Sequence, residues 1–345
     1  PDASSGLTNS KTGITTTSAL GYGGNVTVTL SGSVTTSGAG ASGIVAQSIG
    51  GGGGLIGNYA GSTGGASASG NSSDGNTGTV IVDQTQGSIS ATGAGATGIF
   101  AQNVTAGDQG LGSVDVTVGG TVHGGSGTGA YGVWVDGGNT SNTLTVNAGA
   151  LISADSGVAV NYTGSVGKLS VTNSGNIIGN IVLNSSSTLT NDGILTTPTA
   201  ITAHSLVNNG TLGLDPEMTS LAVTGDLTQS SSGGTSLDVW GADAGLFNTI
   251  NISGTVDMNG DLTVNFVNGF VPQIGATFNF VSAASGTYTF HTIVVTGLPS
   301  GADWQQISSG GDFSLQFVSV PETSSYAIAV VMLLGGIAFL RRRSA

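Results

Sequence analysis

Short runs in which hydrophobic and polar side chains alternate fill much of this chain. In the first clear run, Val26, Val28 and Leu30 alternate with Thr27 and Thr29. Successive side chains of a β-strand point to opposite faces, so this pattern predicts a strand with one buried and one exposed face. Turns rich in glycine and other small residues separate the runs. We therefore expect short strands joined by tight turns.

The runs recur as internal repeats of about 25 residues. The segment 26–50 aligns with 80–104 without a gap, a weaker copy begins at Val114, and a fourth begins at Leu144. Each copy predicts a strand, a glycine turn, a second strand, a turn of small residues and a third, apolar strand. Repeats too short to bury a face alone stack on one another. Residues 1–219 are therefore predicted to form an all-β, right-handed parallel β-helix, which is a solenoid.

Asparagine recurs near the turns from Lys168 to Leu214, where the repeats shorten. Asparagines at equivalent positions of successive coils can stack as hydrogen-bonded ladders. An Asn-Gly step such as the one at Asn209 is also an ordinary surface turn. The pattern leaves both interpretations open.

The sequence changes in character near Asp215 and Pro216, after which the strand-like runs lengthen and aromatic residues become commoner. The block 220–319 resembles the C-terminal end of autotransporter passenger domains, which are surface β-helices. The positions that carry the resemblance are Phe247, Asn248, Ile250, Ile252, Gly254, Gly260, Leu262, Gly269, Phe270, Pro272, Gly275 and Phe278. The resemblance implies a β-rich cap over the last coil of the solenoid, which needs such a cover. The bulk of this cap is expected from Phe266, Phe270, Phe278, Phe280, Phe290 and Trp304.

The final stretch, residues 320–345, differs from everything before it. An uncharged run from Tyr326 to Leu340 is followed by Arg341, Arg342 and Arg343. As a helix this run spans roughly 23 Å, near the lower limit for crossing a bilayer core. A buried core helix is the alternative, but core helices rarely end in three arginines at a chain terminus. We predict a short C-terminal transmembrane helix. Its anchoring residues include Tyr326, Leu333, Leu334, Phe339 and Leu340.

The arginines act as a positive stop, because positive charge beside a span stays on the cytoplasmic side. The stretch resembles a PEP-CTERM sorting signal, which combines a Pro-Glu-Pro motif, a short hydrophobic helix and a terminal arginine cluster. Its motif here is Val320, Pro321, Glu322 and Thr323, with Thr323 where the second proline is usual. The resemblance implies recognition by an exosortase-type processing enzyme in the inner membrane. Transfer to the cell surface, the outer membrane or the extracellular matrix would follow. The departure at Thr323 leaves open whether the tail is cleaved or stays as a membrane anchor.

Composition narrows the classes of function. The chain has 62 glycines and 7% charged residues, which is unusual for a cytosolic enzyme but suits tight turns. Its net charge is −13, and Lys11 and Lys168 are its only basic residues before the tail, so we expect no nucleic-acid partner. Cysteine is absent, which excludes disulfides and thiolate metal sites. The chain starts at Pro1 without a signal peptide, and we expect that an N-terminal export signal is missing.

Candidate carboxylate pairs are few. Asp257 and Asp261 are close in sequence, but Met-Asn-Gly between them indicates a hairpin turn, where aspartate is common for backbone reasons. Asp238 and Asp243 flank Trp240, a combination that suits either a sugar ring or an edge strand followed by a polar loop. The turn and the strand are the preferred interpretations.

Other catalytic signals are weak. His123, His204 and His291 lie far apart without metal-ligand spacing, and no Gly-x-Ser-x-Gly elbow is present. Lys168 alone does not replace the basic residues of a site that resembles pectate lyase. We predict no catalytic residue, no metal site and no cofactor.

These patterns together predict an exported structural or adhesive β-helix protein of the bacterial surface or matrix. Its polar ladders would offer many weak hydrogen bonds to extracellular polysaccharide or to other surface proteins, and multivalency would raise their combined strength. The alternative is a carbohydrate-active β-helix enzyme, either a lyase or a glycosidase. Two carboxylates from different coils that converge in a groove would favour the enzyme.

Overall fold

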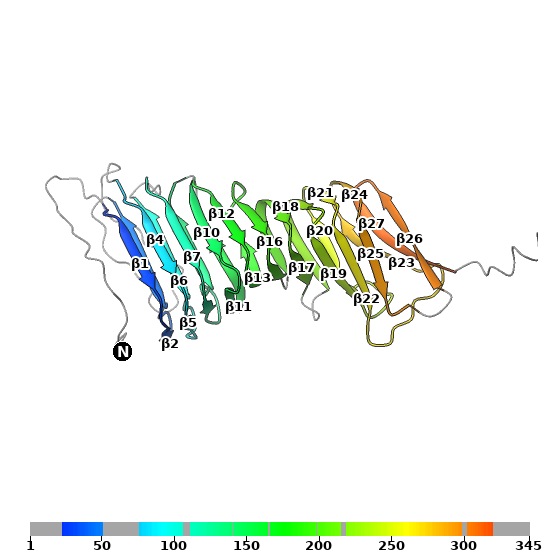
Figure 1. Ribbon diagram of the computed structural model, residues 1–345, viewed down its shortest axis with the longest axis horizontal. Coiled ribbons are helices and arrows are strands. Elements are labelled where there is room, and N and C mark those ends of the chain that lie inside the picture. The colour runs from blue at the N-terminus through cyan, green and yellow to red at the C-terminus, as the bar shows by residue number, and fades with distance from the viewer. Residues whose placement is uncertain are drawn as a thin grey trace, which may run out of the picture.

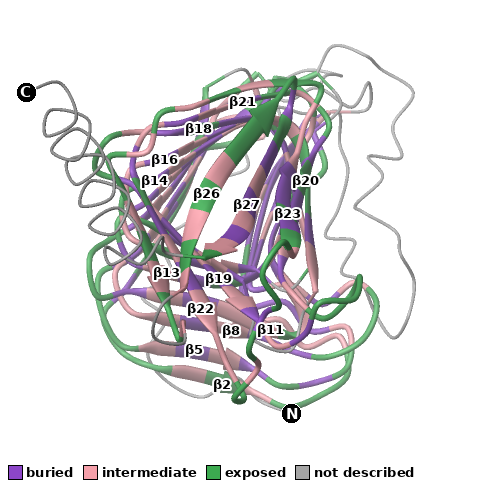
Figure 2. Ribbon diagram, turned by 90° about the vertical axis from the view of Figure 1, so that its right-hand side faces the viewer, coloured by how far each residue is buried: buried purple, intermediate pink, exposed green. Residues whose placement is uncertain are grey.

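The computed structural model describes residues 23–50, 76–105, 111–139, 141–164, 166–197, 199–214, 219–298 and 302–319. Every regular element in this part of the chain is a strand. The strands wind in coils, and each pairs in parallel with the equivalent strand of the next coil. The result is an elongated stack with three faces, which we call A, B and C (Figures 1 and 2). The predicted all-β architecture and its long parallel sheet are confirmed, as expected for a solenoid.

Each face is a ladder of parallel strands. Face A contains β1 (Val26–Leu30), β4 (Val80–Gln84), β7 (Val114–Val118), β10 (Asn142–Val146), β12 (Leu169–Asn173), β14 (Thr188–Asn191), β21 (Thr255–Met258) and β24 (Ser285–Tyr288). Face B contains β2 (Val34–Thr36), β5 (Ser88–Ala91), β8 (Thr121–Gly124), β15 (Ile194–Thr197), β17 (Thr211–Leu214), β19 (Gly234–Val239), β22 (Asp261–Phe266) and β25 (Thr292–Thr296). Face C contains β3 (Ile44–Ile49), β6 (Ile99–Val104), β9 (Val133–Gly137), β20 (Thr249–Ile252) and β23 (Thr277–Ser282).

Four longer strands turn a corner and belong to two faces. The strands β11 (Leu151–Tyr162) and β13 (Asn176–Val182) pass from face B to face C. The strands β16 (Ala200–Asn208) and β18 (Ser220–Gln229) pass from face C to face A. Parallel pairing therefore continues without interruption past residue 220.

The sequence repeats coincide with the coils. Val26 lies opposite Val80, as the predicted alignment requires. Val34 and Ile44, however, lie opposite Ile89 and Ile99, because the second coil has one more residue between the registered positions of face A and face B. The predicted alignment without a gap is therefore wrong by one residue.

Inward side chains stack in apolar columns that form the core. On face A the registered residues Val82, Val116, Leu144, Val171 and Leu189 occupy the same position of successive coils, and all are buried. Burying such a side chain contributes about 1.5–3 kcal/mol relative to leaving it exposed. The column continues through the buried residues Leu206, Leu227 and Val256, so the core extends along most of the stack.

A buried ladder of amides lies at the corner between faces A and B. Asn173 Nδ2 donates to Asn191 Oδ1 at 2.7 Å, and Asn191 Nδ2 donates to Asn208 Oδ1 at 2.7 Å. Asn208 Nδ2 continues the ladder to Gln229 Oε1 at 3.3 Å. Each of these asparagine amides also donates to a main-chain carbonyl at the start of the neighbouring face B strand. The ladder thus satisfies buried polar groups and fixes the register between coils.

Asn209 has the other role that the sequence allowed. It lies in the turn that follows the buried Asn208, and its Nδ2 donates to Asp192 Oδ1 at 2.8 Å on the surface. The two interpretations of the asparagine pattern are therefore both realised, by adjacent residues.

The C-terminal end is closed by antiparallel strands and aromatic rings. The hairpin of β26 (Ala302–Ser309) and β27 (Asp312–Ser319) joins face C through antiparallel pairing of β27 with β23. Phe278 and Phe280 are buried as predicted, together with Phe313, which the sequence had not indicated. The other expected rings pack against the core in partly buried positions, namely Phe266, Phe270, Phe290 and Trp304.

The predicted tail lies outside the described residues. This applies to the motif Val320–Thr323, to the expected transmembrane helix and to the arginines at 341–343. Among the residues that are described, no helix is long and apolar enough to cross a membrane.

The amide ladder predicts different effects for two adjacent substitutions. Asn208→Ala removes a fully buried amide and should lower the free energy of unfolding by about 1–3 kcal/mol. Asn209→Ala removes a surface amide and should change it by no more than about 0.5 kcal/mol. Urea unfolding followed by circular dichroism measures both. Equal losses in the two variants would contradict the assigned roles.

The environment of Tyr288 predicts that the C-terminal end of the stack loses stability at alkaline pH. Its hydroxyl donates to the Gly311 carbonyl at 2.6 Å, and burial, aided by the Asp312 carboxylate, raises the pKa of Tyr288 to about 12 from an ordinary 10.0. The neutral phenol is thus favoured in the folded state. The stabilisation that the neutral Tyr288 phenol contributes to the folded state is complete below about pH 10 and is lost as the pH rises towards 12.

The variant Tyr288→Phe should therefore lose less stability than the wild type between pH 10 and pH 12. At pH 8 it should be less stable by about 1 kcal/mol, because one hydrogen bond is missing. Urea midpoints measured from pH 8 to pH 12 test both effects. If the urea midpoints of the two proteins fell in parallel as the pH rises, another group would control the alkaline loss of stability.

Candidate functional site

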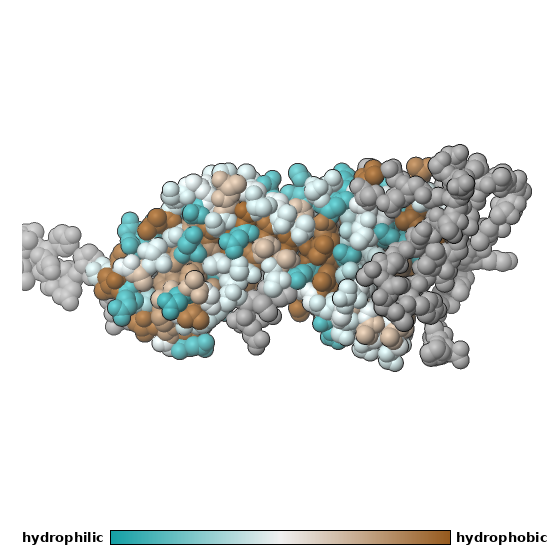
Figure 3. All heavy atoms as spheres, turned by 180° about the vertical axis from the view of Figure 1, so that it is seen from behind, coloured by the Kyte–Doolittle hydropathy of each residue, from teal (hydrophilic) through white to brown (hydrophobic). Residues whose placement is uncertain are grey.

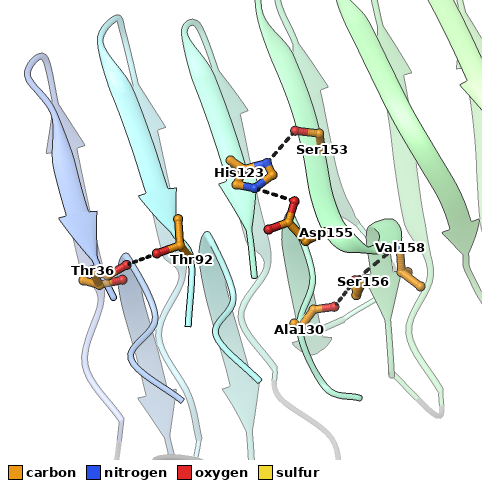
Figure 4. A network of polar contacts seen from close by, with 8 residues as sticks. All are labelled: Thr36, Thr92, His123, Ala130, Ser153, Asp155, Ser156 and Val158. Atoms are coloured by element: carbon orange, nitrogen blue, oxygen red, sulfur yellow. Dashed lines mark hydrogen bonds and ion pairs between the residues drawn. The ribbon is translucent and has the colours of Figure 1, made fainter. Parts of the chain in front are cut away.

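Three polar side chains from two successive coils meet on the outside of face B. His123 lies in β8 between the inward residues Val122 and Gly124, so its ring points outward. Ser153 of β11 lies directly opposite His123 in the strand register, and Asp155 follows two residues later. Figure 4 shows the three side chains pointing toward one another.

The distances are those of a hydrogen-bonded relay. His123 Nδ1 lies 2.9 Å from Ser153 Oγ, and His123 Nε2 lies 3.1 Å from Asp155 Oδ1. A neutral imidazole with its proton on Nε2 donates to the carboxylate and accepts from the hydroxyl. The three groups therefore have the order of a Ser-His-Asp triad, with the roles of the two ring nitrogens exchanged relative to serine proteases.

An irregularity in β11 places Asp155 beside the ring. The pairing of β11 with β13 shifts register between Ser153 and Val158. In this segment Gly157 has a φ of 79°, which favours glycine, and Ser156 Oγ donates to the Ala130 carbonyl at 2.7 Å. These contacts hold the bend where face B turns into face C.

The surroundings do not complete an acyl-transfer site. Such a site needs N–H donors aimed at the oxyanion that forms next to the serine. In parallel sheets the main-chain N–H groups point along the sheet to the neighbouring strands, and Ser153 lies between its registered partners His123 and Ile178. The ladder N–H groups at Ser153 therefore point along the stack, and the contacts of His123 link two coils through polar side chains. We assign this arrangement a structural role.

The carboxylates considered in the sequence do not form a catalytic pair. Asp257 belongs to β21 on face A and Asp261 to β22 on face B. Asp257 Oδ1 accepts from Thr287 Oγ1 at 2.6 Å, and Asp261 Oδ1 lies 3.3 Å from His291 Nδ1. Their strands pair with neighbouring coils and not with each other, so the turn between them is a corner of the coil. The predicted hairpin is therefore wrong, although the turn itself is present.

Trp240 and its flanking aspartates belong to the end of β19 and the loop behind it. Asp238 Oδ1 accepts from Asn265 Nδ2 at 2.9 Å. Trp240 N donates to the Leu246 carbonyl at 3.0 Å, and Leu246 N donates to the Asp243 carbonyl at 3.0 Å. Because β19 pairs with β17 on one side and β22 on the other, it is not the edge strand that the sequence suggested.

Other candidate groups are dispersed. His204 lies in β16, and Lys168 directly precedes β12, where its carbonyl accepts from Asn142 Nδ2 at 3.1 Å. Across the described ranges, no group of three or more His, Cys, Asp or Glu side chains could hold a metal ion.

A shallow hollow lies at the corner between faces A and B. Its volume is about 340 Å³. It is lined by Gly149, Ala150, Leu151, Ser174, Gly175, Asn176, Gly193 and Ile194. These residues include no titratable side chain, so the hollow has no acid or base for catalysis.

No family model, curated protein or solved structure matches this chain.

The sequence did carry a signal for the meeting of His123 and Ser153. The turn from face A to face B contains two residues between β7 and β8 but four residues between β10 and β11. Aligning the repeats with this insertion would place the two residues opposite each other. Without it, they fall out of register.

The structural assignment of His123 predicts no esterase activity at Ser153. Wild-type protein and Ser153→Ala should hydrolyse p-nitrophenyl acetate at the same rate, since the ladder N–H groups at Ser153 point along the sheet. His123→Ala should lower the free energy of unfolding by about 0.2–1 kcal/mol, as expected for a cross-strand polar pair. A wild-type rate clearly above that of Ser153→Ala would contradict the assignment.

Proposed function

We propose that this chain is an exported structural or adhesive protein of the bacterial cell surface or extracellular matrix, built on a right-handed β-helix. The observation that carries the proposal is the repetition of small polar side chains along the outer faces. Thr145, Thr172 and Thr190, for example, occupy one outward position in three successive coils. Repetition of this kind provides many equivalent weak contacts instead of one deep pocket, and such contacts gain strength through multivalency.

The right-handed winding follows from the general preference of parallel strand connections. A strand that returns to its parallel neighbour through a crossover does so with a right-handed turn in nearly all proteins. The described coils pair their equivalent strands in parallel, as such connections require.

The proposed partners are extracellular polysaccharide and other surface proteins, with no role for nucleic acid. The net charge of −13 argues against nucleic acid as a partner. The uncharged hydroxyl side chains on the outer surface of β10, β12 and β14 support contacts with polysaccharide and proteins. Within the described residues, the carboxylates considered above point to separate coil partners and do not converge. This favours a structural or adhesive role over the alternative, a carbohydrate lyase or glycosidase.

The signal that directs the protein to the cell surface is proposed to lie in its C-terminal residues, 320–345. Pro321 and Glu322, the apolar run and the three terminal arginines form the pattern of a sorting signal. An exosortase-type enzyme of the inner membrane would recognise this signal and cut near it. The block 220–319 would then remain as the end of the released β-helix.

Mass spectrometry of the native protein's C-terminus tests this proposal. Mature protein from the cell surface or matrix should lack peptides that contain Arg343, whereas the total membrane fraction should contain a small amount of the uncut form. Replacing Arg341, Arg342 and Arg343 by alanine should leave the full-length chain in the membrane. An Arg343 peptide retained on mature surface protein would refute the sorting role.

A further inference from the structure

Face A carries two parallel columns of hydroxyl side chains on its outer surface. One column consists of Thr27, Ile81, Asp115, Thr143, Ser170, Thr188, Ser205, Asp226, Thr255 and Ser285. The other consists of Thr29, Asp83, Thr117, Thr145, Thr172, Thr190, Val207, Thr228, Asp257 and Thr287. Figure 1 shows β1, β4, β7, β10 and β12 of this face side by side. Serine and threonine fill most positions of both columns.

The central part of the array is uncharged. Between Asp115 and Asp226, three successive strands present the patterns Thr-Leu-Thr, Ser-Val-Thr and Thr-Leu-Thr, in β10, β12 and β14. Within the described chain, the hydroxyls of Thr145, Thr172 and Thr190 have no protein hydrogen-bond partner. These hydroxyls and their methyl groups are therefore presented to water.

The array is two-dimensional and regular. Neighbouring strands are about 4.8 Å apart, and outward residues two apart along a strand are separated by about 6.7 Å. The apolar side chains beneath, such as Val171 and Leu189, are buried and stacked in register. The amide ladder begins at the next residue, since Asn173 follows Thr172 and Asn191 follows Thr190. Both supports hold the outward groups at fixed spacing.

The neighbouring faces lack this regularity. On face B the equivalent outward column also contains hydroxyl residues, but His123, Ile178 and Gly213 interrupt it, so no three successive strands of the described column present a hydroxyl. Its members are Thr35, Ser90, His123, Ser153, Ile178, Thr196, Gly213, Ser236, Thr263 and Val294. On face C, the tilted rings of Phe100 and Trp134 pack against each other with centroids 4.5 Å apart. The hydroxyl lattice is thus a property of one face and not of the surface as a whole.

We propose that the hydroxyl lattice of face A binds ice. Oxygen atoms on a prism plane of hexagonal ice repeat at intervals close to these two spacings, in two perpendicular directions. Threonine suits such a surface, because its hydroxyl can replace a lattice water while its methyl group orders water beside it. Aromatic rings, which stack on sugars, are missing from both columns, and this favours ice over a crystalline polysaccharide. Many weak contacts made together hold the protein on the ice front.

The flanking aspartates set the limits of the site. Asp115 Oδ1 accepts from Thr143 Oγ1 at 2.9 Å, and Asp226 Oδ1 accepts from Thr255 Oγ1 at 2.9 Å. Charged groups keep their own hydration and do not fit a neutral water lattice. The binding surface is therefore centred on β10, β12 and β14.

Two lysine substitutions in one coil test the inference. Thr190 lies in β14 on face A and Thr196 in β15 on face B, and both are outward and half-buried. The purified full chain should inhibit ice recrystallisation at micromolar concentration. Thr190→Lys should require about tenfold more protein, because it disturbs the centre of the lattice. Thr196→Lys should match the wild type, and circular dichroism should show that both variants are folded.

Several results would overturn the inference. The first is a wild-type protein that does not inhibit ice recrystallisation. The second is a loss of inhibition in Thr196→Lys equal to that in Thr190→Lys. The third comes from a binding assay with microcrystalline cellulose. If the wild type sediments with cellulose, Thr190→Lys does not, and ice is unaffected, the face binds a polysaccharide instead. The ice assay is independent of tail processing, so its failure leaves the proposed sorting role untouched.

Discussion

The parallel pairing of each coil with the next is the constraint on which the rest of this structure depends. Once Val82 is registered with Val116, and Val116 with Leu144, every second side chain enters the core and every other one faces solvent. The same register places like residues above one another in columns. Core, polar ladders and outer surfaces are therefore consequences of one repeated alignment.

Buried polar groups enforce that alignment more sharply than the apolar columns can. A valine tolerates a small shift along its column, whereas the amide of Asn191 must reach Asn208 and a main-chain carbonyl at the same time. An unsatisfied amide at 0% exposure would cost about 1–3 kcal/mol. The ladder thus keeps the coils in step at the corner that borders the hydroxyl lattice. At the C-terminal end, antiparallel pairing and the rings of Phe278, Phe280 and Phe313 cover the last coils.

The columns also explain why two polar arrangements on this protein have different meanings. His123, Ser153 and Asp155 contain the groups of a catalytic triad, yet the sheet directs the ladder N–H groups at Ser153 along the stack and not towards an oxyanion. The threonines of face A form no arrangement of reactive groups, but their repetition in successive coils creates a surface with a defined spacing. On a solenoid, function can reside in the periodicity of ordinary side chains, which a search for reactive clusters does not detect.

The sequence by itself determined the strands, their inward residues and the coil repeat. The reason is that the alternation of hydrophobic and polar side chains depends only on the residues of one strand and not on the strands beside it. It also indicated the aromatic end of the stack. Only the tertiary structure decided that Asn208 is a ladder residue while Asn209 is a turn residue. It likewise decided that His123 faces Ser153 and that the threonines of face A form two columns. The physical reason is that register depends on turn length. One extra residue before Ile89, or two before Leu151, changes every partner that follows.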